Sequence, residues 1–229
     1  MTPALRRRRL RTPQILGALA LAALLGIGIG IGIHRLVAGQ PPRIAAPPTA
    51  PGLEGQAVWP AGTRPAPDIT TLTDQTGHRF NLASLRGRTV VMEFFDSHCH
   101  QECPLAGRTL AAAERVLPAG ARPVLVVVSV NPRDTPASAR AAAREWGLAG
   151  LASWHWLMGS TARLAPVWRA YHIVVRPEKG DIGHTEALYL LDRRGDERAG
   201  YLYPYIPGSV AHDLRLLAAP ARGKSGAHA

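Results

Sequence analysis

Cys99 and Cys103 are the only two cysteines of this 229-residue chain, and they stand four positions apart in the segment FFDSHCHQECP. An apolar run at 89–95 leads into them, and a helix-like segment follows. Two thiols at a turn from a buried strand to a helix can close a disulfide, attack one, or hold a thiophilic metal. The residue types and their spacing leave these three uses open.

The spacing of the two cysteines suits all of these uses geometrically. On a helix, residues i and i+4 face the same way with Cβ atoms ~6 Å apart, so both sulfurs can converge on one ion. A small adjustment brings the pair within disulfide reach. The partial positive charge of a helix N-terminus favours the thiolate. A purely structural disulfide is disfavoured, because closing so short a loop stabilises a fold little.

Two thiolates alone suit linear Cu(I), and a third ligand makes the site trigonal. His184 is the favoured histidine. It stands where an irregular stretch, 173–183, meets a predicted strand at 185–191, and in a thioredoxin-like sheet that junction lies beside the first long helix. The other candidate imidazoles are His98, His100, His155 and His172.

Strand-like and helix-like segments alternate between residues 68 and 219, which predicts an α/β fold with a mixed sheet flanked by helices. Two continuous apolar runs, 90–95 and 124–130, indicate buried central strands. Thr135-Pro136 starts a helix that Gly147 ends. The remaining expected elements are a hairpin at 69–82, helices at 104–117, 160–168 and 209–217, a short strand at 154–157, and a hairpin of 185–191 with 198–203.

A membrane anchor is predicted near the N-terminus. Residues 15–33 carry no charge, and as a helix they span about 28 Å, close to the hydrocarbon thickness of a bilayer. Five arginines at 6–11 precede this stretch, so we expect a cytoplasmic N-terminus and an extracytoplasmic domain. A cleaved signal peptide is the alternative. The stretch is long for one, and no small-x-small cleavage site follows closely.

These features predict five segments along the chain. Residues 1–13 form a basic cytoplasmic tail, 14–34 a single transmembrane helix, and 35–67 a Pro-rich linker that stays extended and does not pack. Residues 68–219 form the folded domain, and 220–229 a disordered tail. The net charge of +11 comes largely from the N-terminal arginines and from scattered ones, with no basic stripe of the kind that binds nucleic acid.

Three motifs, in order, resemble the Sco/SenC family of copper proteins. The segment 95–104 resembles its CxxxCP signature, and 129–136 (SVNPRDTP) is similar to its S-V-D-P-x-R-D-T-P segment. The segment 182–192 (IGHTEALYLLD) resembles its V-D-H-S motif with the strand that follows. Order and spacing agree over residues 68–217, and an anchor with a Pro-rich stalk agrees as well.

The resemblance implies a thioredoxin-like fold, with copper, as Cu(I) or Cu(II) or both, held by Cys99, Cys103 and His184. It further implies a metallochaperone rather than an enzyme. Such a protein delivers copper to the CuA centre of cytochrome c oxidase during assembly, or keeps the cysteines of that centre reduced. The implied partner is the oxidase subunit that carries CuA.

The main alternative is a thiol-disulfide oxidoreductase that uses Cys99 and Cys103 as a redox pair on partner proteins. Redox thioredoxins normally have C-x-x-C spacing and a cis-proline facing the thiols. This chain has three intervening residues and no proline between Asp181 and Leu191, which favours a metal. A peroxide-scavenging relative of the fold is less favoured, because no threonine lies just before Cys99.

Three positions depart from the family pattern: His100 replaces a proline, and Asn131 and Gly183 each replace an aspartate. Losing two carboxylates makes the predicted site less negative and removes possible hydrogen-bond acceptors around the ligands. We expect Asp134 to cap the helix that begins near Thr135. Arg133 is expected to have a structural role, and core or rim positions are expected for Trp154, Trp156 and Trp168.

Overall fold

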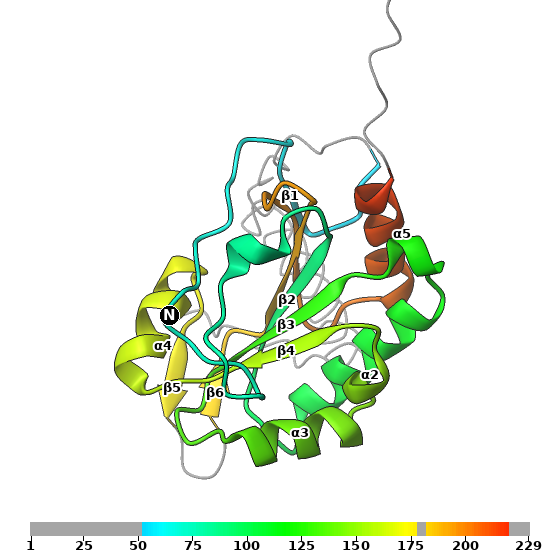
Figure 1. Ribbon diagram of the computed structural model, residues 1–229. Helices are drawn as coiled ribbons and strands as arrows, with labels where there is room; N and C mark the ends of the chain where they lie inside the picture. Colours follow the sequence, from blue (N-terminus) through cyan, green and yellow to red (C-terminus); the bar gives the residue numbers. More distant parts are fainter. Residues whose placement is uncertain (1–51, 178–181, 220–229) are drawn as a thin grey trace, which may run out of the picture. The chain divides into compact units, whose positions relative to one another are not determined.

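The computed structural model describes residues 52–177 and 182–219, and its centre is a six-stranded mixed sheet (Figure 1). The strand order is β1-β8-β7-β2-β3-β4. β2 is parallel to β3, and β3 to β4, whereas β7 is antiparallel to β2 and β8, and β1 to β8. The strands are β1 (Ala57–Val58), β2 (Val90–Phe95), β3 (Val124–Ser129), β4 (Trp154–Leu157), β7 (Ala187–Leu191) and β8 (Glu197–Leu202).

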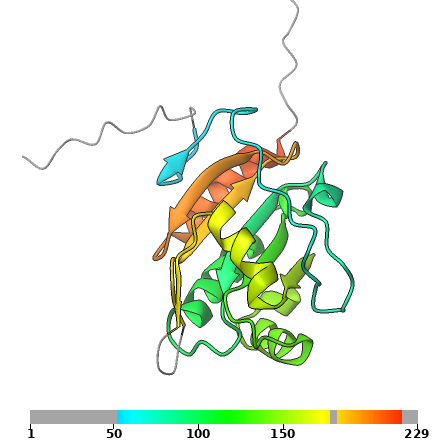
Figure 2. The same cartoon turned by 90° about the vertical axis from the view of Figure 1, so that its left-hand side faces the viewer.

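Helices cover both faces of this sheet. One core contains Val91 and Phe95 of β2 together with apolar residues of α2, α3 and α5, and the other contains Val90, Met92 and Phe94 with residues of α4. Figures 1 and 2 show α4 on the opposite side of the sheet from α2 and α3. The helices are α2 (Glu102–Arg115), α3 (Pro136–Glu145), α4 (Thr161–Ala170) and α5 (Pro207–Ala218), with 3₁₀ turns at Leu82–Leu85, Ala119–Ala121 and Leu148–Gly150.

The predicted central strands and the predicted helix after Thr135 are confirmed. Every residue of β2 and β3 is buried, as expected of parallel strands covered on both faces. Thr135 caps α3 through a reciprocal pair with Ser138, and Pro136 occupies the first turn. Gly147 follows α3 with φ +81°, the left-handed conformation that glycine adopts without strain.

One prediction about local structure is wrong. The stretch expected to be irregular contains β5 (Val175–Pro177) and β6 (Ile182–His184), which pair as an antiparallel hairpin. These strands are too short for alternation to reveal them. The hairpin expected at 69–82 is present in a short form, with an antiparallel bridge between Thr73 and Arg79 and a turn closed by the Asp74 N–H on the His78 carbonyl.

The structure also differs from the predicted linker at 35–67, because its described part packs on the domain. β1 pairs with β8, Val58 is buried, and the Trp59 N–H donates to the Arg198 carbonyl. The backbone N–H groups of Glu54 and Gly55 donate to the carboxylate of Asp213 on α5. The folded unit therefore begins upstream of residue 68.

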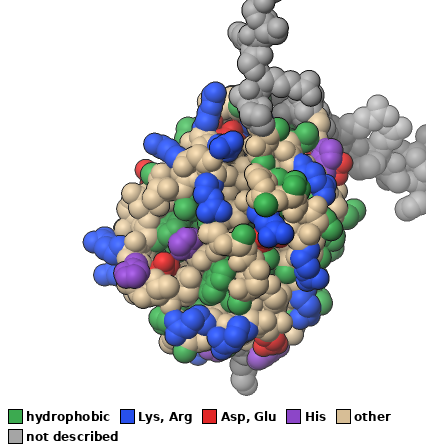
Figure 3. All heavy atoms as spheres, turned by 45° about the vertical axis from the view of Figure 1, so that its right-hand side comes forward, with side chains coloured by type: hydrophobic (Ala, Val, Ile, Leu, Met, Phe, Trp, Pro, Cys, Tyr) green, Lys and Arg blue, Asp and Glu red, His purple; other side chains and the backbone are tan. Residues whose placement is uncertain are grey.

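The predicted cytoplasmic tail, transmembrane helix and C-terminal tail lie outside the described residues. Among the helices of the described part, none has the length and apolar character needed to cross a membrane. On the face shown in Figure 3, Lys and Arg side chains are dispersed over the surface, with acidic and apolar groups between them.

Candidate metal centre

The two cysteines follow the carboxyl end of β2, but only one of them is helical. Cys103 is the second residue of α2 and is fully buried. Cys99 lies in the preceding loop, half-buried, and its N–H donates to the carbonyl of Asp96. The i, i+4 geometry of a helix face therefore does not apply to this pair, although the two sulfurs do converge. The loop instead places Cys99 against Cys103, and the two side chains form a hydrogen bond.

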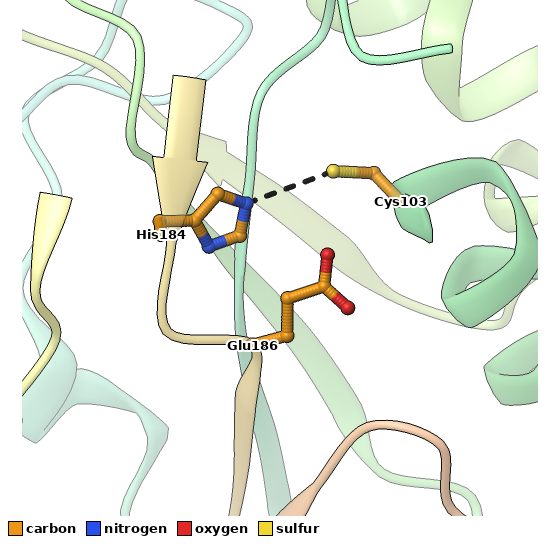
Figure 4. Close-up of side chains that lie close together, drawn as sticks. All are labelled: Cys103, His184 and Glu186. Atoms are coloured by element: carbon orange, nitrogen blue, oxygen red, sulfur yellow. Dashed lines mark hydrogen bonds between the residues drawn. The ribbon is translucent and has the colours of Figure 1, made fainter. Parts of the chain in front are cut away.

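His184 ends β6, opposite Val175 of β5, and its ring reaches the start of α2 (Figure 4). The Nε2 atom lies 3.8 Å from the Sγ atom of Cys103. The Nδ1 atom lies 3.2 Å from the Thr185 carbonyl oxygen, which can only accept, so Nδ1 carries the proton in this contact. The Nε2 lone pair then faces the sulfur. Burial lowers the pKa of His184 and favours the neutral, ligating form of the ring.

The electrostatics of Cys103 differ from the prediction based on the helix N-terminus. The pKa of the Cys103 thiol is raised, first by its hydrogen bond with Cys99, then by burial and by the nearby charge of Cys99. The helix end contributes only a fraction of an elementary charge, which does not outweigh these effects. Without a metal, the buried sulfur is therefore held as a thiol, and a bound cation has to displace its proton.

Glu186 is a fourth group at this place, and it was not predicted from the sequence. One oxygen of its carboxylate, a His184 ring nitrogen and the Cys103 sulfur all lie within 4.8 Å of one another. Burial, together with the negative charges of Glu102 and Cys99, raises the pKa of Glu186 to about 7. The sequence does contain a signal: in an extended segment, residues i and i+2 point to the same side, and His184 and Glu186 have this spacing.

An open groove of about 670 Å³ lies beside the metal centre. Its walls come from the start of α2, from β6 and from the end of β8. Cys99, His184 and Glu186 all line it, so a ligand of a partner molecule can approach the sulfur of Cys99 from solvent.

The donor set fits copper. Two sulfurs and an imidazole nitrogen are the soft and borderline donors that copper prefers. Donor atoms bound to one ion at about 2.0–2.3 Å lie roughly 3–4 Å from each other. The 3.8 Å between Cys103 and His184 is already within this range, and the groove leaves room for an ion.

The other candidate histidines lie elsewhere. His155 Nδ1 is 3.3 Å from an oxygen of Asp74, and His98 Nδ1 is 3.3 Å from an oxygen of Asp134. His100 and His172 are exposed. Of the described residues, His184 is the histidine whose ring lies within one ion's reach of Cys103.

The residues around the cysteine loop correct one prediction and explain one departure. Thr135, not Asp134, caps α3, whereas buried Asp134 accepts hydrogen bonds from the Ser97 and Ser129 hydroxyls. Asn131 donates through Nδ2 to an oxygen of Asp96, at 2.9 Å. An ionised aspartate at 131 could not make this bond and would face Asp96 as a like charge.

The tryptophans are confirmed as core or rim residues. Trp156 and Trp168 are buried and donate through their indole N–H groups to Ser129, and Trp154 is half-buried at the start of β4.

Fold and site together define a thioredoxin-like domain with two cysteines and one histidine at the carboxyl end of its central strand. The model of the SCO1/SenC family matches residues 69–219, and the chain belongs to this family. No curated protein sequence was found to match the chain.

Solved structures support the fold. The ScoI protein of Bradyrhizobium japonicum, solved with copper bound, is 26% identical, with a TM-score of 0.54 over 66% of this chain and 98% of that one. Arabidopsis thaliana ScoI, also with copper bound, is 22% identical, with a TM-score of 0.56 over 65% and 94%. BsSco, in which a disulfide switch was identified, is 18% identical, with a TM-score of 0.57 over 70% and 97%.

Proposed function

We propose that this chain is a copper metallochaperone that supplies the CuA centre of cytochrome c oxidase during assembly of the enzyme. The observation that carries the proposal is the convergence of His184 on Cys103, 81 positions apart in the chain and 3.8 Å apart in space. Family membership supports it, as do the relatives solved with copper. BsSco is described as belonging to a family of cytochrome c oxidase assembly proteins.

Copper is the cargo in this proposal. Cys99 and Cys103 hold Cu(I) through two sulfurs, and His184 supplies a third donor. Cys103 and His184 are anchored by α2 and by the β5–β6 hairpin, whereas Cys99 sits in a half-buried loop at the groove. A partner's sulfur can therefore replace Cys99 first, so that copper passes between proteins without being released to solvent.

We further propose that the domain works outside the cytoplasm, tethered by the uncharged stretch at 15–33. The arginines at 6–11 support this orientation. The single-pass anchor then holds the domain beside the membrane in which an oxidase subunit carrying CuA is assembled.

A thiol-disulfide oxidoreductase is the second candidate. The hydrogen bond between Cys99 and Cys103 places the two sulfurs side by side, and the disulfide switch in BsSco supports redox use of such a pair in a relative. In this candidate, the Cys99–Cys103 disulfide forms while a disulfide of the partner is reduced by the same two electrons. His184 is then not required.

The variant His184→Ala separates the two functions. Under the copper proposal, the full chain should lose Cu(II) affinity by about 100- to 1000-fold, the share of one ligand in a metal site. Cu(I) affinity should fall less, because two sulfurs suffice for linear coordination. The Cys99–Cys103 disulfide should still form. His155→Ala is the matched control, because that half-buried histidine pairs with Asp74 away from the thiols.

Competition with chelators of known affinity measures both copper states, and thiol titration measures the disulfide. If His184→Ala bound copper as tightly as the parent, the metal would have to lie with His98 or His100. If the variant also matured the oxidase fully, the thiol-disulfide function would replace the copper proposal.

A further inference from the structure

The Glu186 carboxylate is the least explained charged group at the metal centre. Figure 4 shows it on the same side as the His184 ring and directed toward Cys103. The backbone holds it there, because the Glu186 carbonyl accepts the Tyr203 N–H at 3.0 Å, where β7 and β8 begin to pair. Glu186 is half-buried and lines the groove together with Cys99 and His184.

Glu186 differs from the residues that follow it in β7. Those residues are apolar and bury their side chains in the two cores, whereas Glu186 is half-buried and lines the groove beside His184. A carboxylate that faces this groove can accept a bond from an ion bound there, so its position points to a ligand.

We propose that Glu186 is a fourth ligand, which binds copper in the Cu(II) state and not in the Cu(I) state. This inference rests on the proposed copper function and deepens it. The oxygen of Glu186, the nitrogen of His184 and the sulfur of Cys103 are within 4.8 Å of one another, about 1 Å more than the spacing of ligands on one ion. The open groove leaves the Glu186 side chain room to close this gap.

The preference for Cu(II) follows from coordination chemistry. Cu(I) is soft and satisfied by two sulfurs and one nitrogen, whereas Cu(II) favours four ligands in a tetragonal arrangement and accepts oxygen. With Cys99, Cys103 and His184, Glu186 completes such a set.

The formal charge of copper and its bound ligands also favours Glu186 as a ligand of Cu(II). Two thiolates and Cu(I) leave one negative charge, and two thiolates, one carboxylate and Cu(II) also leave one. If Glu186 bound Cu(I), two negative charges would be left in a partly buried place, which is unfavourable. Copper and the ligands bound to it thus carry the same net charge in both oxidation states.

The test compares two glutamates that border the same groove. Glu186→Gln keeps the size of the side chain and removes the charge, and Glu102→Gln does the same at an exposed residue whose charge also acts on Glu186. In the full chain, we expect Glu186→Gln to weaken Cu(II) binding about 10- to 100-fold and Cu(I) binding less than about threefold. Glu102→Gln should change either affinity by less than about threefold.

The Cu(II) electron paramagnetic resonance spectrum reports the ligands directly. It should change in Glu186→Gln and stay the same in Glu102→Gln. If Cu(II) binding falls tenfold while Cu(I) binding holds, the reduction potential of bound copper rises by about 59 mV. Urea unfolding followed by tryptophan fluorescence shows that the variant is folded.

Three outcomes would overturn the inference. Equal losses in both variants would mean that Glu186 acts through its charge at a distance. An unchanged spectrum and affinity in Glu186→Gln, beside a loss in His184→Ala, would remove Glu186 from the site and leave the copper function standing. Equal losses of Cu(I) and Cu(II) in Glu186→Gln would refute the preference for Cu(II). A parent chain that binds no copper would instead refute the proposed function itself.

Discussion

Two groups of side chains in the described part of the chain each gather three metal-ligating atoms within 4.8 Å. One is the metal centre, with Cys103, His184 and Glu186. The other, which we name the aspartate cluster, consists of Asp96, His98 and Asp134. Both include a carboxylate and a histidine, and both adjoin the segment that follows β2. By distance alone, either could be a metal site.

They differ in how their lone pairs are used. In the aspartate cluster, Asp96 accepts from the Asn131 side chain and the His98 N–H, both at 2.9 Å. Asp134 accepts from the Ser97 hydroxyl at 2.6 Å and the Ser129 hydroxyl at 2.7 Å. In the metal centre, the Nε2 of His184 meets only the weak thiol donor of Cys103, and the Glu186 carboxylate lines an open groove.

The comparison teaches that a ligand site is recognised by lone pairs that strong hydrogen-bond donors of the fold leave open, rather than by proximity alone. It also gives the aspartate cluster a role. The Ser97 hydroxyl contacts both Asp134 and Ser138, so the cluster ties the loop before Cys99 to β3 and α3. The aspartate cluster holds the loop before Cys99 in place, and the metal centre lies beside the cysteine that this loop carries.

The largest effect that would sharpen this comparison is expected from Asp134→Ala. The substitution leaves the hydroxyls of Ser97 and Ser129 without their buried acceptor, so we expect a loss of about 2–4 kcal/mol in the free energy of unfolding. Cu(I) affinity of the folded chain should change less than about threefold, because Asp134 binds no copper. Urea unfolding followed by tryptophan fluorescence, with a parallel copper titration, measures both.

Ser97→Ala is the matched control for Asp134→Ala. It removes one donor and keeps the acceptor, so it should cost only about 0.5–1.5 kcal/mol. A tenfold loss of copper affinity in Asp134→Ala at unchanged stability would break the comparison, since the aspartate cluster would then take part in binding.

Glu93 is a buried carboxylate with few hydrogen-bond donors, and the pH dependence of the free energy of unfolding tests the same rule at this residue. It is fully buried on β2, and burial raises its pKa well above the ordinary value despite hydrogen bonds from the Tyr205 hydroxyl and the Phe94 N–H. Glu186 faces it as a like charge and raises the pKa further. The folded chain therefore binds the Glu93 proton more tightly than the unfolded chain does.

The sign of the pH dependence follows. The stability contributed by Glu93 is fully present below the pKa of an unfolded glutamate, about 4.3, and is lost as pH rises through the raised pKa of the folded state. Glu93→Gln cannot ionise and keeps an acceptor for Tyr205. Relative to the parent, we expect it to gain about 1–2 kcal/mol between pH 5 and pH 7, against an upper limit of about 1.4 kcal/mol per pH unit.

Unfolding curves of both proteins at several pH values measure this difference, and other titrating groups cancel in the subtraction. A difference that did not depend on pH would mean that Glu93 keeps an ordinary pKa. Hydrogen bonds would then fully offset the effect of burial on the pKa of Glu93. Carboxylates with and without hydrogen-bond donors would no longer be expected to differ.

Much of the fold could be predicted because its signals are long or chemically specific. The apolar runs of β2 and β3 and the Thr135-Pro136 helix start needed no tertiary information. β1 and the β5–β6 hairpin were missed because strands of two or three residues are stabilised by the partners they pair with, not by a pattern of their own.

The candidate site was predictable where residue type and motif carry the information, and not where geometry does. Cys99, Cys103 and His184 came from spacing and from a family resemblance. Glu186 looked like an ordinary polar residue at the edge of a strand until the fold placed it beside His184. Asp134 was misassigned because Thr135 competes for the same cap, and the buried contacts of Asp134 come from residues 5 and 37 positions away.

The smallest effects are expected from His98→Ala and His100→Ala, and they probe the comparison from the side of the aspartate cluster. The ring of His98 is about half exposed and rests on carboxylates that already have donors, and His100 is exposed between the cysteines. Each substitution should cost less than about 0.5 kcal/mol of stability, as exposed charged contacts do. Copper affinity should change less than about threefold, measured by the competition used for His184→Ala.

A tenfold loss in His98→Ala would make the aspartate cluster a second ligand group, whereas the same loss in His100→Ala would place an imidazole from the loop on the copper. Unchanged affinity in both leaves His184 as the histidine that copper requires, and lone pairs without strong donors as the property that distinguishes the two clusters.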